Sequence, residues 1–542
     1  MSRQRIVILG GGFAGVFAAM KLEALSKSRT DLEITLVNHE NYFVFQPLLP
    51  EIISCDIGLT DAISPLRRLL PRTQLFIRDV DGVDFETNTV RLRPGFWPQL
   101  RSVRFNHLII AMGTVTDFRG SPGLAEHALR FKTLQDAVVL RNHLIQVVQE
   151  AGIEEDPARK AALLTFVVAG GGFSGVECCA QINDFVRRLA KHEPSIDPAQ
   201  IQVLLAHSGP RILDKEFPES LSEYSQRVLL KKGIRLLLGK RLKAATPDSA
   251  VFADGERILT KTLVSTVPSS PNPAVEGMGL PEERGRLIVD GMLRVQGKEN
   301  VWSLGDCALV PLPKGGYAPP TAQHATRQAA HLARNMVRAI DGKPLATFSF
   351  EMLGKMGALG HRSAVAELFG KVRLSGLLAW LMWRTIYWWK LPGIDRKIRL
   401  GVSWFLDLLI RPDFVQLRLD AQPGVGQRHY ETDEFVFMQG DLGDALYVIL
   451  KGSVAVIARM DGAEQEIAQL QAGECFGELA VMSQEGRTAS IRCREPTDLM
   501  VINRSDFRSL VSHLPNFARG FEEMATTRRA ACAENAAPAI DR

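Results

Sequence analysis

Two glycine-rich segments of nearly the same sequence have the spacing that binds the pyrophosphate of a dinucleotide. Each reads GxGxxG, follows a short apolar run and precedes residues of helical composition. In such a turn the first glycine permits a tight bend, the second lets the backbone approach the phosphates, and the third allows close packing of helix on strand. The helix N-terminus then faces the anion. The glycines are Gly10, Gly12 and Gly15 in the first loop and Gly170, Gly172 and Gly175 in the second.

A carboxylate that usually completes such a site is absent from both copies. An acid about 20 residues after the loop, at the end of the second strand, normally binds the ribose hydroxyls. The second strands are expected at 32–37 and 201–206, and Asn38 and His207 follow them. Asn38 can still form a hydrogen bond with a ribose, although a weaker one, and His207 stands where the second acid is expected.

Two further segments could face a ligand bound by the first loop. Asp306 follows an apolar strand predicted at 301–304, and a carboxylate at the carboxyl edge of a parallel sheet lies in its ligand crevice. A turn residue or helix cap is the alternative for Asp306. Pro319 and Pro320 precede a segment of helical composition, so a helix is expected to start at Thr321.

An α/β fold with several cores must position these residues. At 542 residues the chain should contain about three or four domains, and the strand–loop–helix units predict two Rossmann-like domains. The net charge of +5 is small for this length and does not suggest nucleic acid as a partner. No metal-ligand spacing or Ser–His–Asp set is evident, so no metal is expected. The N-terminus enters a strand without a signal-peptide core, which favours the cytoplasmic side.

The cysteines show no CxxC or CxxxxC spacing, which excludes the paired-thiol chemistry of disulfide reductases. They are expected to be buried or incidental thiols in a reducing cytoplasm. The seven positions are 55, 178, 179, 307, 475, 493 and 532.

Residues 371–411 have the composition of a membrane-surface segment. They hold five of the seven tryptophans, and seven basic residues face one acid between 371 and 400. The apolar run at 374–389 contains Arg384 and is shorter than the about 20 residues that span a bilayer. The next helix would carry one apolar stripe, which favours helices lying in the membrane interface. A dimer or interdomain helix pair is the alternative. The stripe consists of Ile394, Ile398, Val402, Phe405 and Leu409.

Several motifs together resemble the type II NADH:quinone oxidoreductases over about residues 1–410. They are NYFVFQPLLPEI at 41–52, ISPLRRLL at 63–70, LIIAMGTVTDF at 108–118, VWSLGDCA at 301–308 and PPTAQHATRQAA at 319–330.

The resemblance implies a FAD domain split by an inserted NADH domain. The first glycine loop and Asn38 would then bind FAD, Asp306 would accept hydrogen bonds from its ribityl chain, and Ala322 and Gln323 would lie at the flavin. The second loop would bind the nicotinamide donor, with Glu177 near the reacting ring. A first-turn acid favoured by the helix dipole is the alternative for Glu177.

Two positions depart from the family pattern. The family lines its quinone site with Gln323 and a second glutamine four residues on, but the second position is Arg327 here. At His207 the family has an acid that selects the 2′-hydroxyl of NADH. Its loss, with Arg211 close by, removes a repulsion against a 2′-phosphate, so both NADH and NADPH are considered as donors.

The C-terminal part resembles a cyclic-nucleotide-binding domain, across about residues 413–527. Its short strands and turns predict an antiparallel β-roll. The resemblance implies that Gly477 and Arg487 hold the cyclic phosphate, that Glu478 binds the ribose 2′-hydroxyl, and that Thr488 and Ala489 complete the cassette. An arginine fork suits a phosphate anion, and cAMP or cGMP is the expected regulator. Ligand-free domains of this fold are the alternative.

The predicted organisation combines these parts. The expected domains are the FAD domain at 1–120 and 276–350, the NAD(P)H domain at 121–275, a membrane-associating region at 351–412, the cyclic-nucleotide domain at 413–527 and a disordered tail at 528–542. The favoured function is reduction of a quinone by NAD(P)H through FAD, at the cytoplasmic face of the inner membrane, with anionic lipids and a second copy of the chain as partners. A sulfide:quinone oxidoreductase, which would need two redox cysteines, and a non-catalytic membrane binding module are the alternatives.

Overall fold

The protein is described from a computed structural model. The structure describes residues 3–507 with the exception of 98, 100, 117, 119–120, 267–268, 408, 410–413, 417–424, 442, 444, 461–462, 479–480, 482–485 and 505. The predicted tail at 528–542 lies outside this range. Contacts divide the chain into one unit of residues 1–88 and 104–418 and a second of residues 89–103 and 419–542.

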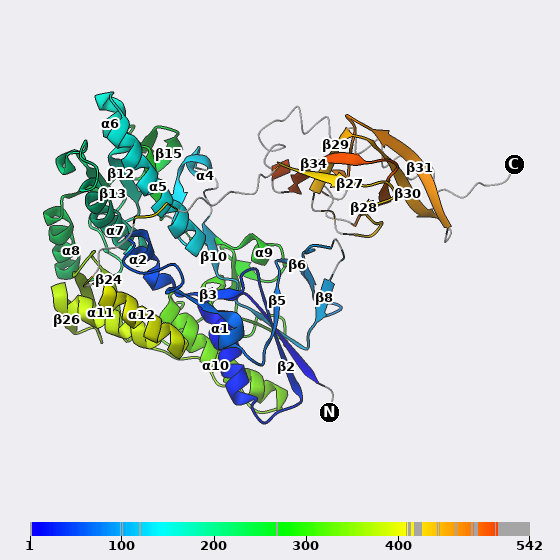
Figure 1. The fold of residues 1–542 in the computed structure, drawn as a ribbon. Coiled ribbons are helices and arrows are strands. Elements are labelled where there is room, and N and C mark those ends of the chain that lie inside the picture. The colour runs from blue at the N-terminus through cyan, green and yellow to red at the C-terminus, as the bar shows by residue number, and fades with distance from the viewer. Residues whose placement is uncertain are drawn as a thin grey trace. The chain divides into compact units, whose positions relative to one another are not determined.

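The first parallel sheet of the larger unit carries the first glycine loop. Its strand order is β22–β9–β1–β2–β5. The bounds are Val301–Ser303, His107–Ile110, Gln4–Leu9, Leu32–Asn38 and Gln74–Ile77, in that order. Helix α1 (Phe13–Leu25) packs on β1 and β2 and lies beside α10 (Ala322–Ile340), as Figure 1 shows. The apolar residues of β1 from Ile6 to Leu9 are fully buried, as predicted for a strand covered on both faces.

A second parallel sheet repeats this arrangement around the second glycine loop. Its order is β11–β18–β12–β13–β14, with bounds Leu129–Arg130, Thr262–Ser265, Thr165–Ala169, Gln202–His207 and Ile234–Leu238. Three helices pack against this sheet: α5 (Leu134–Ile153), α7 (Phe173–Ala190) and α8 (Glu219–Lys231). The two predicted Rossmann-like domains are therefore confirmed.

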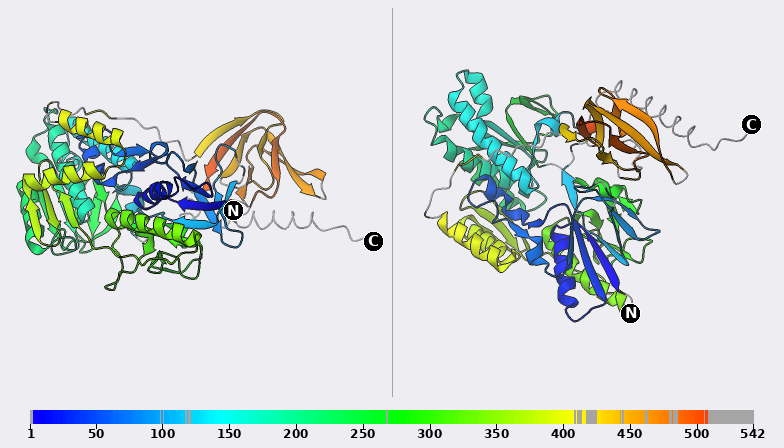
Figure 2. Two further views of the ribbon diagram at one scale, coloured as in Figure 1. Left: turned by 90° about the horizontal axis from the view of Figure 1, so that it is seen from below. Right: turned by 45° about the vertical axis from the view of Figure 1, so that its right-hand side comes forward.

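The end of the larger unit adds an antiparallel sheet and two helices. The sheet consists of β24 (Gly354–Ala358), β25 (Ala364–Leu368) and β26 (Val372–Ser375). Helices α11 (Gly376–Lys390) and α12 (Ile394–Leu406) follow and lie side by side (Figures 1 and 2). Short helix α2 (Leu49–Ile53) packs on α5 and α7.

The second unit contains the predicted antiparallel roll. One sheet has the order β27–β34–β29–β32 and the other β28–β33–β30–β31. The first comprises Val425–Tyr430, Thr497–Asn503, Ala445–Lys451 and Cys475–Phe476, and the second Phe435–Phe437, Ser490–Cys493, Ser453–Met460 and Ala463–Gln471. A buried apolar cluster that includes Phe437, Tyr447 and Phe476 forms its core.

Candidate functional site

The first glycine loop has the backbone geometry of a phosphate-binding turn. Gly10 has φ +103°, and a Cβ there would lie 2.4 Å from the carbonyl oxygen of Ala111. A Cβ on Gly15 would lie 1.9 Å from the carbonyl oxygen of Gly10, so only glycine allows α1 to approach β1. In contrast, a Cβ on Gly12 would meet nothing within 4 Å. Open space therefore lies in front of the N-terminus of α1, which has no side-chain cap.

The second loop has the same geometry. Gly170 has φ +122°, and a Cβ on Gly175 would lie 1.8 Å from the Gly170 carbonyl oxygen. A Cβ on Gly172 would lie 3.0 Å from Oε1 of Glu216. The two loops therefore have the same geometry at their first and third glycines. They differ at the middle glycine, because the Glu216 carboxylate lies near Gly172 and nothing lies near Gly12.

Asn38 and His207 have matching positions at the two loops. Each is the last residue of its strand rather than the residue after it. The Gly11 N–H donates to Asn38 Oδ1 at 2.7 Å, and the Gly171 N–H donates to His207 Nδ1 at 3.2 Å. Both side chains therefore brace the glycine loop.

Asp306 lies at the carboxyl edge of the first sheet, as expected from its sequence position. It is in a 3-10 turn, Gly305–Cys307, directly after β22. Burial raises the pKa of Asp306, and the nearby cations Lys132 and Arg286 act against that rise. Among the described residues no hydrogen-bond donor contacts its carboxylate. A part-buried acid without a donor suits the hydroxyls of a ligand, and with the open space at Gly12 these residues fit FAD.

Lys132 lies close enough to Asp306 to affect its pKa, and the sequence did not indicate this residue. Its Nζ donates to Thr114 Oγ1 at 2.6 Å. Burial lowers the pKa of Lys132, with opposing effects of Asp306 and Asp136. Nothing in the local pattern distinguishes this lysine from a solvent-exposed one, because the groups that surround it come from distant segments.

The helix predicted from Thr321 is α10. Thr321 is its N-cap, and the His324 N–H donates to the Thr321 hydroxyl at 3.3 Å. Ala322 and Gln323 form its first turn. Gln323 Oε1 accepts from the Leu353 N–H at 2.9 Å, so this amide ties α10 to the start of β24. The Arg327 guanidinium lies over the Phe350 ring, 5.4 Å from its centre.

Glu177 is the fifth residue of α7, beyond the first turn in which the sequence alternative placed it, and lies among groups of α11, β24 and α2. Its Oε1 accepts from the Ala358 N–H at 2.9 Å. Burial is the largest of the causes that raise the pKa of Glu177 to about 8, and Glu51 adds to the rise. Burial and the Glu177 charge both raise the pKa of Tyr387. At neutral pH the Glu177 carboxyl therefore keeps its proton.

A buried charge cluster joins α11 and α12 to α2. Arg384 Nη2 lies 3.4 Å from Glu51 Oε1, and its guanidinium lies between the rings of Trp380 and Trp404, 4.1 and 4.8 Å from their centres. Trp404 Nε1 donates to Glu51 Oε2 at 2.7 Å. Burial outweighs these partners and raises the pKa of Glu51 to about 7.

The helix α12 has its apolar stripe outward. The predicted stripe residues Ile394, Ile398, Val402 and Phe405 lie in α12 and are between 51% and 79% exposed, whereas the fifth predicted member, Leu409, lies beyond the end of this helix. Arg396 is 8% exposed and donates to the Thr60 carbonyl oxygen at 2.9 Å. Ser403 donates to Asp61 Oδ2 at 2.8 Å. Within the described part of the chain, no helix is both long and apolar enough to cross a bilayer.

In the roll, three of the predicted nucleotide ligands come together. The Arg487 guanidinium donates to the carbonyl oxygens of Gly477 and Ala445, each at 2.8 Å, and lies 4.0 Å from the centre of the Phe437 ring. Glu478 is buried beside Gly477. Thr488 is exposed and Ala489 buried. Most of the cassette between Glu478 and Arg487 lies outside the described residues.

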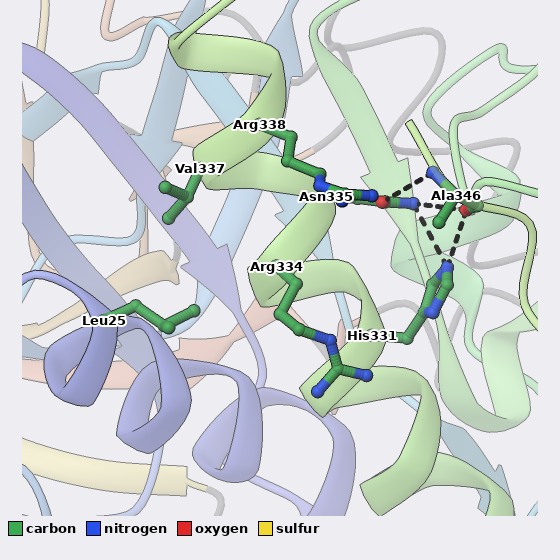
Figure 3. Close-up of a pocket in the computed structure, with 7 residues that line it drawn as sticks. All are labelled: Leu25, His331, Arg334, Asn335, Val337, Arg338 and Ala346. Carbon is green, nitrogen blue, oxygen red and sulfur yellow. Dashed lines mark hydrogen bonds between the residues drawn. The ribbon is translucent and has the colours of Figure 1, made fainter. Parts of the chain in front are cut away.

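A separate cavity of about 300 Å³ lies at the C-terminal half of α10 (Figure 3). His331 and Asn335 both bond to the carbonyl oxygen of Ala346, at 2.8 Å each. These contacts anchor the segment after α10, and no predicted site residue lines the cavity. In the described ranges, no three His, Cys, Asp or Glu side chains gather into a metal site.

The families and relatives that the chain resembles agree with this architecture. The pyridine nucleotide-disulphide oxidoreductase family matches residues 4–329, and the cyclic nucleotide-binding domain family matches residues 427–513. The chain is 32% identical over 410 residues to demethylphylloquinone reductase NdbB of Synechocystis sp., which covers 74% of this chain and 96% of that protein. It is 30% identical over 426 residues to type II NADH:quinone oxidoreductase NdhA of Mycobacterium tuberculosis, with 76% and 88% covered.

Solved structures share the fold of the larger unit. NDH2 from Plasmodium falciparum in complex with NADH aligns with a TM-score of 0.71 at 17% identity, over 76% of this chain and 100% of that one. The sulfide:quinone oxidoreductase of Aquifex aeolicus aligns with a TM-score of 0.59 at 18% identity, over 73% and 92%. At these identities the likeness concerns the fold alone.

Proposed function

The chain belongs to the type II NADH:quinone oxidoreductases of the pyridine nucleotide-disulphide oxidoreductase family, and from this premise we propose that it oxidises NADH or NADPH and reduces a quinone. The observation that carries the proposal is the pair of equivalent glycine loops, in which a Cβ on the third glycine would lie only 1.9 or 1.8 Å from the carbonyl oxygen of the first. One loop would bind FAD, which stays on the protein, and the other would bind NADH or NADPH, which is exchanged. FAD, when bound, supplies the hydride-accepting ring and passes two electrons to the quinone.

The residues divide between the two carriers. The first loop, Asn38 and Asp306 would hold FAD, with Ala322 and Gln323 presenting the N-terminus of α10, whose partial positive charge suits an electron-rich ring. The second loop and His207 would hold the donor. Glu177 would lie beside the nicotinamide as a neutral carboxyl, because its pKa of about 8 keeps it protonated. It can donate a hydrogen bond without adding a charge, whereas donating the proton would leave a carboxylate at this position.

The test is anaerobic mixing of purified protein with NADH or NADPH and then with a quinone. The expected result is one FAD per chain, bleaching of the flavin absorbance by the donor, and its return with quinone. The proposal would be contradicted if the protein binds FAD but neither donor bleaches the flavin absorbance. In a sulfide:quinone oxidoreductase, sulfide would instead bleach the flavin absorbance.

The thiols argue against that second chemistry. Burial raises the pKa of Cys55, Cys178, Cys179, Cys307 and Cys493. Since the thiolate is the reactive form, these side chains are poor nucleophiles.

The same proposal places the enzyme on a membrane surface, at the cytoplasmic face of the inner membrane and as a homodimer. The support for contact with a membrane is the outward apolar stripe of α12 together with Leu378 and Trp389 of α11, which are 69% and 73% exposed. Polar contacts of Arg396 and Ser403 hold the other face of α12 to the protein. An amphipathic helix with basic neighbours binds anionic lipid surfaces. The protein should be found in the pellet when it is sedimented with anionic vesicles. For the homodimer, analytical ultracentrifugation in detergent should show twice the mass of one chain.

Regulation by a cyclic nucleotide is the last element of the proposal. The matched domain and the grouping of Gly477, Glu478 and Arg487 support it. Calorimetric titration with cAMP and cGMP should show binding to the wild type and none to Arg487→Lys, because a lysine cannot form the two-pronged contact with a phosphate. Quinone reduction should then change on addition of the nucleotide to the wild type alone. Equal behaviour of both proteins would contradict a regulatory site.

A further inference from the structure

The segment between β13 and α8 folds back over the second glycine loop. The Leu213 N–H donates to the Gly171 carbonyl oxygen at 2.8 Å, and Leu213 is buried with φ 55°. Ser222 at the start of α8 donates to the Ile212 carbonyl oxygen at 2.6 Å. These contacts hold residues 208–218 above the loop that would bind the donor.

His207 is oriented toward an acid of this segment. Its Nδ1 accepts from the Gly171 N–H, so in the neutral ring the proton is on Nε2. Nε2 lies 3.5 Å from Asp214 Oδ1. A Cβ on Gly209 would lie 2.6 Å from His207 Nε2 and 2.8 Å from Asp214 Oδ2. The imidazole, the carboxylate and the Gly209 backbone thus meet at one place, at the end of the second strand.

The surrounding charges are unfavourable for a second phosphate. Glu216 is the next acid, and its carboxylate lies over Gly172 on the pyrophosphate side of the loop. Arg211, the cation that the sequence suggested beside a 2′-phosphate, is ion-paired with Glu219. Lys355 donates its Nζ hydrogen to the carbonyl oxygen of Glu216 at 2.8 Å.

We propose that Asp214, which lies beside His207, replaces the missing strand-end acid, accepts a hydrogen bond from the ribose 2′-hydroxyl and makes the chain select NADH over NADPH. The inference rests on the proposed function, since it concerns the donor site of that reaction. A 2′-hydroxyl can donate to the Asp214 carboxylate, whereas a 2′-phosphate would be repelled by it. The loss of the acid at position 207 therefore does not open the site to NADPH.

Binding of oxidised donors to the FAD-loaded enzyme tests this without turnover. Calorimetric titration with NAD⁺ and NADP⁺ should give at least tenfold tighter binding of NAD⁺ to the wild type. Asp214→Asn should reduce that preference about tenfold, chiefly by tightening NADP⁺ binding. A second substitution, His207→Asp, should restore it in the Asp214→Asn protein, because an acid at the strand end can accept the same hydrogen bonds.

Two further variants separate this role from general charge effects. Glu223→Gln removes one exposed charge from α8 and should leave the preference unchanged. Glu216→Gln should tighten both dinucleotides by the same factor, because its carboxylate lies on the pyrophosphate side that they share.

The inference is overturned if the wild type binds NAD⁺ and NADP⁺ equally, or if Asp214→Asn keeps the wild-type preference. Failure of the proposed function would appear differently, as an FAD-loaded protein whose flavin is reduced by neither NADH nor NADPH.

Discussion

The stability of the larger unit should decrease with rising pH because of Glu177. Its pKa rises from 4.5 to about 8 in the folded protein, with burial as the largest cause. Below pH 4.5 the carboxyl is protonated in both states and contributes no pH dependence. Between 4.5 and 8 the unfolded chain releases the proton while the folded chain keeps it, so folding becomes less favourable as the pH rises. One pKa unit is worth about 1.4 kcal/mol, which gives a loss of at most about 5 kcal/mol.

Glu177→Gln should remove most of this dependence, because the amide is neutral at every pH and can still accept from the Ala358 N–H. The assay is thermal unfolding of the FAD-loaded proteins at several pH values from 5 to 9. The wild type should lose several degrees across this range. The variant should retain a smaller slope due to Glu51, whose pKa rises to about 7. Glu223→Gln is the matched control and should follow the wild type. Parallel curves for wild type and Glu177→Gln would refute the reasoning.

Substitutions at three other places, the first glycine loop, the buried charge cluster and the exposed stripe, have equally definite outcomes. Gly15→Ala would place a Cβ 1.9 Å from a backbone oxygen of its own loop, so the purified protein should lack flavin absorbance, whereas Gly12→Ala should fold normally and bind FAD more weakly. Arg384→Met leaves the buried Glu51 carboxylate without its cation and should lower the free energy of unfolding in urea by about 3–5 kcal/mol at pH 8, and adding Glu51→Gln should recover most of it. Ile398→Asp adds a charge to the exposed stripe and should reduce sedimentation with anionic vesicles while flavin content stays unchanged.

The parts of the fold that depend on local pattern could be predicted from the sequence. The glycine spacing defines both turns, because a Cβ on the third glycine collides with the carbonyl oxygen of the first in each loop. The prolines before Thr321 located the start of α10, and its hydroxyl is indeed the N-cap acceptor. The short strands after residue 413 likewise predicted the two antiparallel sheets of the roll.

The direction of polar side chains could not be predicted in the same way. The sequence placed Asn38 and His207 where a ribose-binding acid is expected, and only for Asn38 did its chemistry suggest contact with a ribose. In the structure each first accepts an N–H from its glycine loop, 27 and 36 residues earlier. The same limit applies to Asp214, because only the fold-back of residues 208–218 brings its carboxylate to His207.

Helix α12 shows most clearly why periodicity alone is insufficient. A stripe of Ile394, Ile398, Val402 and Phe405 predicts an amphipathic helix, and folding in water normally turns such a stripe inward. Here the polar face is turned inward, because Arg396 finds the Thr60 carbonyl oxygen and Ser403 finds Asp61. Those contacts satisfy buried polar groups that would otherwise cost free energy. Because its polar face is engaged by the protein, the helix leaves its apolar face exposed. This is the orientation that the proposed contact with a membrane surface requires, and a lipid-soluble quinone would be dissolved in that membrane.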